Sequence, residues 1–162
     1  IFGLFLFSSS LKKLISQITI FTIAHSITLI FVSLSLMRIN PQIVEPIIAL
    51  SIVYIGLENI FKKYIKEYLR YVVILFFGLL HGLGFALVLS DIGYRSTDLF
   101  INLVSFNIGI EVAQISIVLV LYLLIALNFA KNKNYRILFQ VPSSILISSI
   151  GLYWFFERIN FI

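Results

Sequence analysis

The fourth apolar run of the chain, residues 71–90, has the sequence YVVILFFGLLHGLGFALVLS. It contains no lysine, arginine, aspartate or glutamate, and an α-helix needs about 20 such residues to cross the hydrocarbon core of a bilayer. His81 lies near the middle of the run. An ionisable side chain is costly at that depth, which makes it a candidate for function. The run therefore predicts a membrane-spanning helix with a functional group near its centre.

The rest of the chain has the same character. Of its 162 residues, 60% are hydrophobic and 12% are charged, whereas a soluble domain carries roughly 25% charged residues. Breaks in the apolar runs predict a partial span over about 1–9 and five full spans over about 14–37, 42–61, 70–90, 98–128 and 136–157. The predicted fold class is all-α: a polytopic transmembrane helix bundle that forms one domain over residues 1–162. We expect the short run Ile1–Phe7 to be the end of a first helix that begins before Ile1.

The basic residues divide unevenly between the two sides of the predicted bundle. The loops after spans one, three and five, counting the partial span as the first, hold 9 of the 12 lysines and arginines. These are Lys12, Lys13, Lys62, Lys63, Lys66, Arg70, Lys131, Lys133 and Arg136. Since basic loops stay on the cytoplasmic side, these three loops are predicted to be cytoplasmic, in a multi-pass protein of an inner (cytoplasmic) membrane. The chain has no cysteine, which excludes disulfides and thiolate metal sites.

Three spans each place one strong polar group near the membrane midplane. His25 and His81 each lie about 11 residues into their spans, and Glu111 about 13. Imidazole and carboxylate groups suit a divalent metal ion, with nickel, zinc, cobalt or copper as candidates. The sequence therefore predicts a metal site made of His25, His81 and Glu111. The remaining candidates for a polar path or for supporting the ligands are Asn107, Gln114, Ser26, Glu58 and Glu45.

Spacing explains the choice of these supporting residues. Asn107 and Gln114 share a helix face with Glu111 because they stand at i, i+4 and i+7, and such a polar face should avoid lipid. Glu45 stands before Pro46, as in the first turn of a helix, where a carboxylate favours the helix dipole. Glu58 stands four residues before Lys62, a spacing at which the two can pair.

Several of these residues occur in segments that resemble the HupE/UreJ family of small bacterial integral membrane proteins. The matching segments are Phe21-Thr22 with Ala24-His25-Ser26 and Thr28-Leu29, Val44-Glu45 with Ile48-Ala49-Leu50-Ser51, Glu58-Asn59, Phe77-Gly78-Leu79 with His81-Gly82 and Gly84-Phe85-Ala86, and Phe106-Asn107 with Gly109, Glu111 and Gln114. The resemblance implies a nickel or cobalt permease linked to hydrogenase and urease maturation. It also implies a further motif, His followed by Gly-x-Asp-His, in a first helix upstream of Ile1.

Two other functions fit the same residues. A metal held permanently with one open position would make the chain a membrane-embedded metalloenzyme, with Glu111 or Glu58 as general base. Alternatively, the chain is an accessory subunit of a membrane complex, in which the polar residues join helices and no metal binds. We lean towards a transporter rather than an enzyme. The expected partners are the lipid bilayer, a metal ion, and a second copy or a larger membrane complex, with no nucleic acid.

Overall fold

The computed structural model describes residues 1–7, 10–61, 66–91, 99–126 and 134–159. Its elements are α1 (Phe2–Phe7), α2 (Leu11–Ser33), α3 (Pro41–Ile60), α4 (Glu67–Asp91), α5 (Leu99–Leu121) with the π-helical turn η2 (Tyr122–Ala126), and the π-helical turn η3 (Arg136–Gln140), which continues into α7 (Val141–Ile159). Within these residues five helices are long and apolar enough to cross a membrane. The predicted all-α, multi-pass bundle is confirmed.

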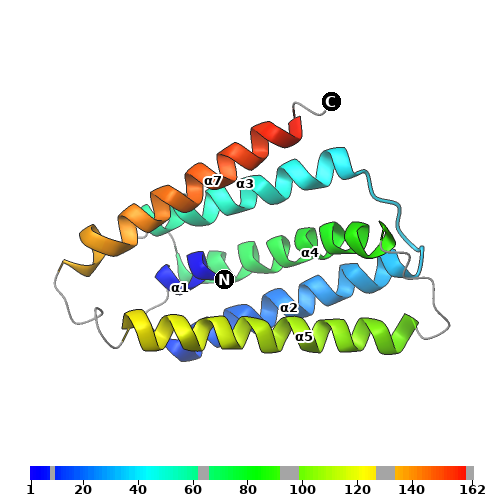
Figure 1. Cartoon of the computed structure of the whole chain (residues 1–162), viewed down its shortest axis with the longest axis horizontal. Coiled ribbons are helices and arrows are strands. Elements are labelled where there is room, and N and C mark those ends of the chain that lie inside the picture. Colours follow the sequence, from blue (N-terminus) through cyan, green and yellow to red (C-terminus); the bar gives the residue numbers. More distant parts are fainter. Residues whose placement is uncertain (8–9, 62–65, 92–98, 127–133, 160–162) are drawn as a thin grey trace.

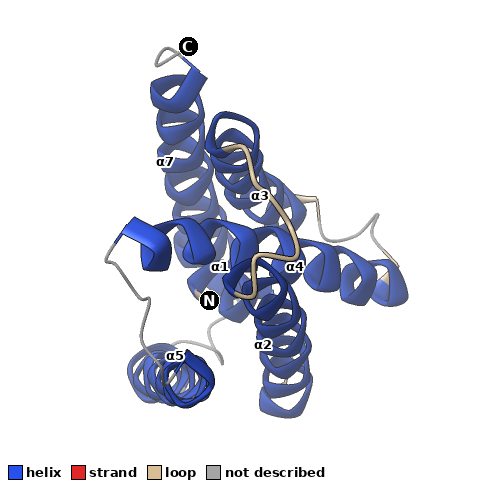
Figure 2. Cartoon of the chain, turned by 90° about the vertical axis from the view of Figure 1, so that its right-hand side faces the viewer, coloured by secondary structure: helices blue, strands red, loops and turns tan. Residues whose placement is uncertain are grey.

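The long helices pack in the order α7–α3–α4–α2–α5, each contacting the next. Figure 1 shows α7 beside α3, α5 beside α2, and α4 between the two pairs. Figure 2 views α5 nearly end-on at the edge of the bundle, and its apolar segment is the least buried of the five spans. The short helix α1 lies inside this arrangement and contacts α2, α3, α5 and α7. The elements around α1 therefore define the centre of the molecule.

Local signals set where the helices begin and end. Ser10 caps α2 by accepting a hydrogen bond from the backbone N–H of Lys13 at 3.3 Å. Asn40 caps α3 by accepting one from the N–H of Gln42 at 3.0 Å, and Pro41 follows at the first helical position, where its missing N–H costs nothing. Helix α2 ends at Ser33, before the predicted residue 37, because the chain turns through Ser35 with φ of 57°.

The cap at Asn40 corrects the expected place of Glu45, although α3 begins within one residue of the predicted start of the third span. Because α3 already begins at Pro41, Pro46 lies inside the helix and Glu45 lies beyond its first turn. The helix dipole acts mainly within that first turn. The predicted capping role of Glu45 is therefore wrong, and its carboxylate is available for a contact with another helix.

Glycines allow two pairs of helices to approach closely. A Cβ on Gly78 of α4 would lie 2.6 Å from the carbonyl oxygen of Phe21 on α2, and one on Gly82 would meet the carbonyl oxygen of His25. On the other seam, a Cβ on Gly56 of α3 would lie 2.8 Å from the carbonyl oxygen of Ser144 on α7. Small residues are what lets membrane helices pack backbone to backbone. These contacts fix how α2 and α4 are rotated, and hence where their histidines lie.

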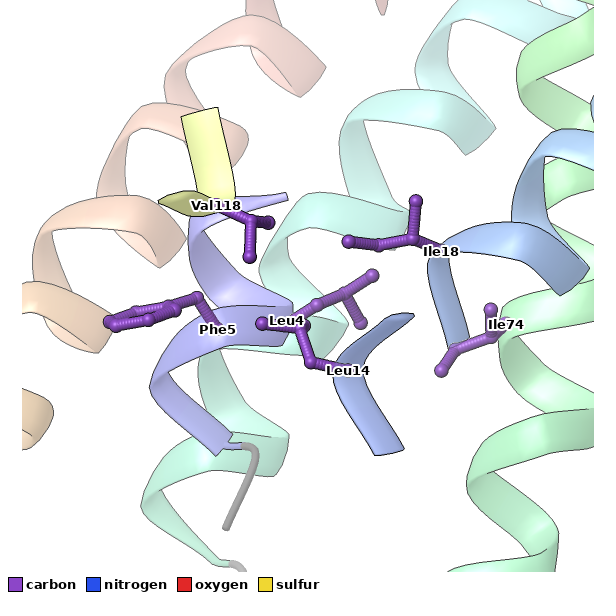
Figure 3. Packing of buried hydrophobic residues seen from close by; sticks show 6 residues of the cluster. All are labelled: Leu4, Phe5, Leu14, Ile18, Ile74 and Val118. Atoms are coloured by element: carbon purple, nitrogen blue, oxygen red, sulfur yellow. The ribbon is translucent and has the colours of Figure 1, made fainter. Parts of the chain in front are cut away.

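The centre of one half of the bundle is apolar (Figure 3). Its buried side chains come from α1, α2, α4 and α5: Leu4, Phe5, Leu14, Ile18, Ile74 and Val118. Because four helices contribute to this cluster, it holds α1 against the bundle.

Candidate functional site

His25 of α2 and His81 of α4 lie in one aromatic environment. The ring of Phe21 contacts both, with centroid distances of 6.2 Å to His25 and 5.2 Å to His81. The ring of Phe85 lies edge-on to His25 at 5.0 Å. The close α2–α4 seam therefore brings the two predicted histidines into a common setting, and neither Phe21 nor Phe85 had been assigned a role from the sequence.

His81 is held by its own helix. Its Nδ1 lies 2.8 Å from the carbonyl oxygen of Phe77, one turn earlier. A carbonyl can only accept, so in this contact Nδ1 carries the proton and donates it. In the neutral ring, Nε2 is then left with a free lone pair, the form in which imidazole binds metals. Metal-ligating histidines commonly donate their second nitrogen in this way, which orients the ring.

His25 is buried, with 1% of its surface exposed. Neither of its ring nitrogens has a hydrogen-bond partner within the described part of the chain. A buried polar atom without a partner costs about 1–3 kcal/mol, so such atoms call for an explanation. A ligand that the imidazole binds during function would supply one.

Two cavities meet at His81. One, of about 340 Å³, is lined by His81, Gly84 and Phe85 of α4 and by residues of α3 and α7 that include Glu45 and Arg158. The other, of about 520 Å³, is lined by His81 and Phe85 and extends to α1, Phe21 and Gln114. Ile52, His81, Phe85 and Trp154 line both. His81 therefore stands on the wall shared by a cavity near the Glu45 end of α3 and a cavity in the bundle centre.

Two members of the polar stripe on α5 turn towards α2. Gln114 is buried and accepts a hydrogen bond from the hydroxyl of Thr22 at 2.9 Å. The hydroxyl of Ser26 lies 2.6 Å from Oδ1 of Asn107 and 2.7 Å from the carbonyl oxygen of Thr22. The expectation that this face avoids lipid holds for Asn107 and Gln114. Both amides join α5 to the helix that carries His25.

Glu111 lies in a different place. It lines a separate pocket of about 140 Å³ between α2 and α5, together with Thr19 and apolar side chains. Neither of the two cavities lined by His81 includes Glu111, and in the described ranges no three His, Cys, Asp or Glu side chains gather as a metal-binding group. The two histidines are thus brought together without Glu111, and the three-ligand set stays a prediction.

Glu58 pairs with a residue that its spacing did not indicate. Its carboxylate lies 2.9 Å from the guanidinium of Arg70 on α4, and both side chains are completely buried. Lys62, the partner expected from sequence, lies outside the described residues. Arg70 had been counted as a loop residue, but α4 begins at Glu67 and carries it into the bundle. The pair joins α3 to α4 at the Glu58 end of the bundle.

Glu45 also has a partner from a distant part of the sequence. It lies 3.3 Å from Arg158 on α7, and the two side chains are 46% and 34% exposed. Arg158 in turn contacts the ring of Trp154, the only tryptophan of the chain. Neither Arg158 nor Trp154 was among the site residues predicted from the sequence. Both line the cavity that reaches His81.

Comparison with known proteins agrees with the segments that carry the resemblance. The HupE / UreJ protein family matches residues 1–158, nearly the whole chain. No curated protein and no solved structure matches it. Together with five helices that can cross a membrane, the match shows that this multi-pass membrane protein belongs to the HupE/UreJ family.

Proposed function

We propose that the chain is a permease for a divalent metal ion of the nickel type, and that the ion passes His81. The observation that carries the proposal is the position of His81 on the shared wall of two cavities, with Nδ1 engaged by Phe77 and Nε2 left as an acceptor. Membership of the HupE/UreJ family supports it, because that family is associated with nickel and cobalt transport.

His25 supports the same function from the adjacent helix. Its unpartnered nitrogens offer a second imidazole in the aromatic setting that surrounds His81. Transport requires release as well as binding, so two imidazole ligands suit a transient stop better than a closed four-ligand site. Glu111, on the far side of α2, is proposed to balance the charge of the ion, as Asp or Glu residues within a membrane do by facing a polar path.

Uptake of radioactive nickel into cells that express the protein tests this function. We expect His81→Ala to reduce the initial rate by at least about tenfold, and His25→Ala to reduce it less, since loss of groups that only support a metal ligand already costs that much. Ser116→Ala is the matched control: Ser116 is exposed on α5, and within the described residues its hydroxyl donates to the Val112 carbonyl of its own helix. Unchanged uptake in both histidine variants would contradict the proposal.

Elemental analysis of the purified protein separates transport from catalysis. A permease should lose its metal on dialysis, because its cargo must leave. Stoichiometric metal that survives dialysis would instead favour a membrane-embedded metalloenzyme that uses the same histidines.

The proposed location is the bacterial inner membrane, with the Glu58 end of α3 on the cytoplasmic side. The excess of basic residues in the loops at that end supports this orientation. Because the chain has no cysteine, single cysteines at Lys12 and at Arg38 can be labelled with a membrane-impermeant thiol reagent. Only the cysteine at position 38 should react in intact cells.

A further inference from the structure

The cavity of about 340 Å³ that reaches His81 has an ion pair in its wall. Glu45 of α3 and Arg158 of α7 both line it, and their charged groups lie 3.3 Å apart. The same cavity is lined by His81 and Trp154. A cation that approaches His81 through this cavity therefore passes the Glu45–Arg158 pair.

Arg158 is held by several weak contacts. Besides Glu45, it lies 3.7 Å from the carboxylate of Glu157, and its guanidinium lies 5.8 Å from the centre of the Trp154 ring. It also donates a hydrogen bond of 3.2 Å to the Trp154 carbonyl oxygen. Two carboxylates thus contact one guanidinium, so the cluster of Glu45, Glu157 and Arg158 carries a formal net charge of −1. Such a cluster attracts cations while its own arginine occupies the place nearest the carboxylates.

Because the Glu45–Arg158 ion pair is partly exposed, it breaks easily. The side chains of Glu45 and Arg158 are 46% and 34% exposed, and ion pairs this accessible contribute little stability because water and salt screen them. A divalent cation also interacts with a carboxylate twice as strongly as a guanidinium does at the same separation and dielectric constant. Competition for Glu45 would therefore favour the incoming ion.

We propose that Arg158 is a tethered cation that closes the cavity by pairing with Glu45, and that an entering divalent cation displaces it from that carboxylate. The inference rests on the proposed function for the identity of the displacing ion. Glu45 is then the group that first receives the ion, and Arg158 sets how strongly an ion must bind to gain access to His81. Neither residue holds the ion at its midplane stop.

Thiol accessibility tests the closure without any measurement of transport. Ile52 lines both cavities, and in this cysteine-free chain Ile52→Cys would be the only thiol. In the purified full chain in lipid nanodiscs, we expect a water-soluble thiol reagent to modify Ile52→Cys about three- to fivefold faster when Arg158→Gln is added, in line with the small stability of an exposed ion pair. Arg38→Gln, an exposed arginine outside the cavity lining, is the control and should leave the rate unchanged.

Two further variants test whether faster thiol modification results from general loosening of the fold. Arg158→Lys keeps the charge and should keep modification slow. The exchange of Glu45→Arg with Arg158→Glu should restore slow modification relative to either single change. If Arg158→Gln leaves the rate unchanged, or if the exchanged pair stays as fast as the singles, the closure is overturned.

Nickel uptake distinguishes this inference from the function on which it rests. We expect Glu45→Gln to raise the nickel concentration for half-maximal uptake about threefold, and Arg158→Gln to lower it. Absence of uptake by the unmodified protein would overturn the proposed function, whatever the thiol rates show. Normal uptake with unchanged half-saturation in both variants would overturn the role of the pair alone.

Discussion

The two ends of α3 each carry a glutamate paired with an arginine, yet the two pairs differ in nearly every physical respect. Glu45 and Glu58 stand about 20 Å apart along the helix. Glu58 and Arg70 are completely buried, whereas Glu45 and Arg158 are each more than a third exposed. The same chemistry thus appears once inside the packed bundle and once at the wall of a cavity.

The polar contacts around the two ends of α3 also differ. Near Glu58, the amide of Asn59 donates to the Gly3 carbonyl, and the exposed final carbonyl of the helix, that of Ile60, accepts from Arg136 at 3.0 Å. These bonds join α3 to α1 and to the turn before α7. Near Glu45, the polar contact to another helix is the exposed ion pair with Arg158 beside the cavity, and the buried Val44 and Ala49 supply apolar packing. Polar bonds therefore anchor α3 at its Glu58 end, whereas its Glu45 end is held by apolar packing and one exposed ion pair.

Removal of one buried partner should have the largest effect. We expect Arg70→Met to lower the free energy of unfolding by about 3–5 kcal/mol, because the Glu58 carboxylate would be left buried without its counter-charge. Thermal unfolding in detergent measures the change. Glu58→Leu added to Arg70→Met should recover much of the loss, since two apolar side chains leave no buried charge. If Arg70→Met is as stable as the unchanged protein, the buried ion pair does not anchor the Glu58 end of α3.

A matched pair of glycine substitutions should have an intermediate effect. Gly56→Ala on the anchored α3–α7 seam should cost about 1–3 kcal/mol, because its Cβ would meet the Ser144 carbonyl oxygen at 2.8 Å and the Ser148 hydroxyl. Gly84→Ala, in the cavity wall, would meet only the tip of the Ile48 side chain at 2.5 Å. Since that tip can move into the cavity, we expect little loss there. Equal losses in the two variants would show that packing at the two ends is alike.

The smallest effect on stability should come from the exposed pair. Glu45→Gln should change the free energy of unfolding by at most about 1 kcal/mol, and added salt should reduce the difference further. Unfolding temperatures at low and high salt check this. A loss as large as that of Arg70→Met would mean that both ends of α3 are anchored, and it would also count against an opening at Glu45.

Apolar run length predicted the helices well because a bilayer imposes a simple requirement on length and composition. The five long helices lie close to the predicted spans, and the close approach of Gly78 and Gly82 to α2 agrees with their small size. His25 and His81 do lie in one aromatic setting, but depth alone could not show this, because Glu111 has a similar predicted depth and lines another pocket. Depth could not reveal Phe21 and Phe85 as the rings around them, because apolar aromatics are common throughout the chain.

The sequence could not predict the ion-pair partners of the charged residues, for a related reason. Local spacing predicted Lys62 as the ion-pair partner of Glu58, but in the packed bundle Glu58 pairs with Arg70 of the next helix. Glu45 was assigned to a helix start, but it pairs with Arg158, 113 positions later. Each of these contacts depends on the rotation of whole helices about their axes. The separation of Glu111 from the cavity of His81 has the same origin.

The sequence by itself determined that this chain is a membrane-spanning helical bundle, roughly where each helix runs, and at what depth its rare polar groups lie. Only the tertiary structure decided which polar groups meet. The physical reason is that a helix in a bilayer is apolar on its lipid face and on its packed face alike, so hydrophobic periodicity carries little information about rotation. That rotation is set by close contacts such as those of Gly56, Gly78 and Gly82, which exist only once the helices are packed.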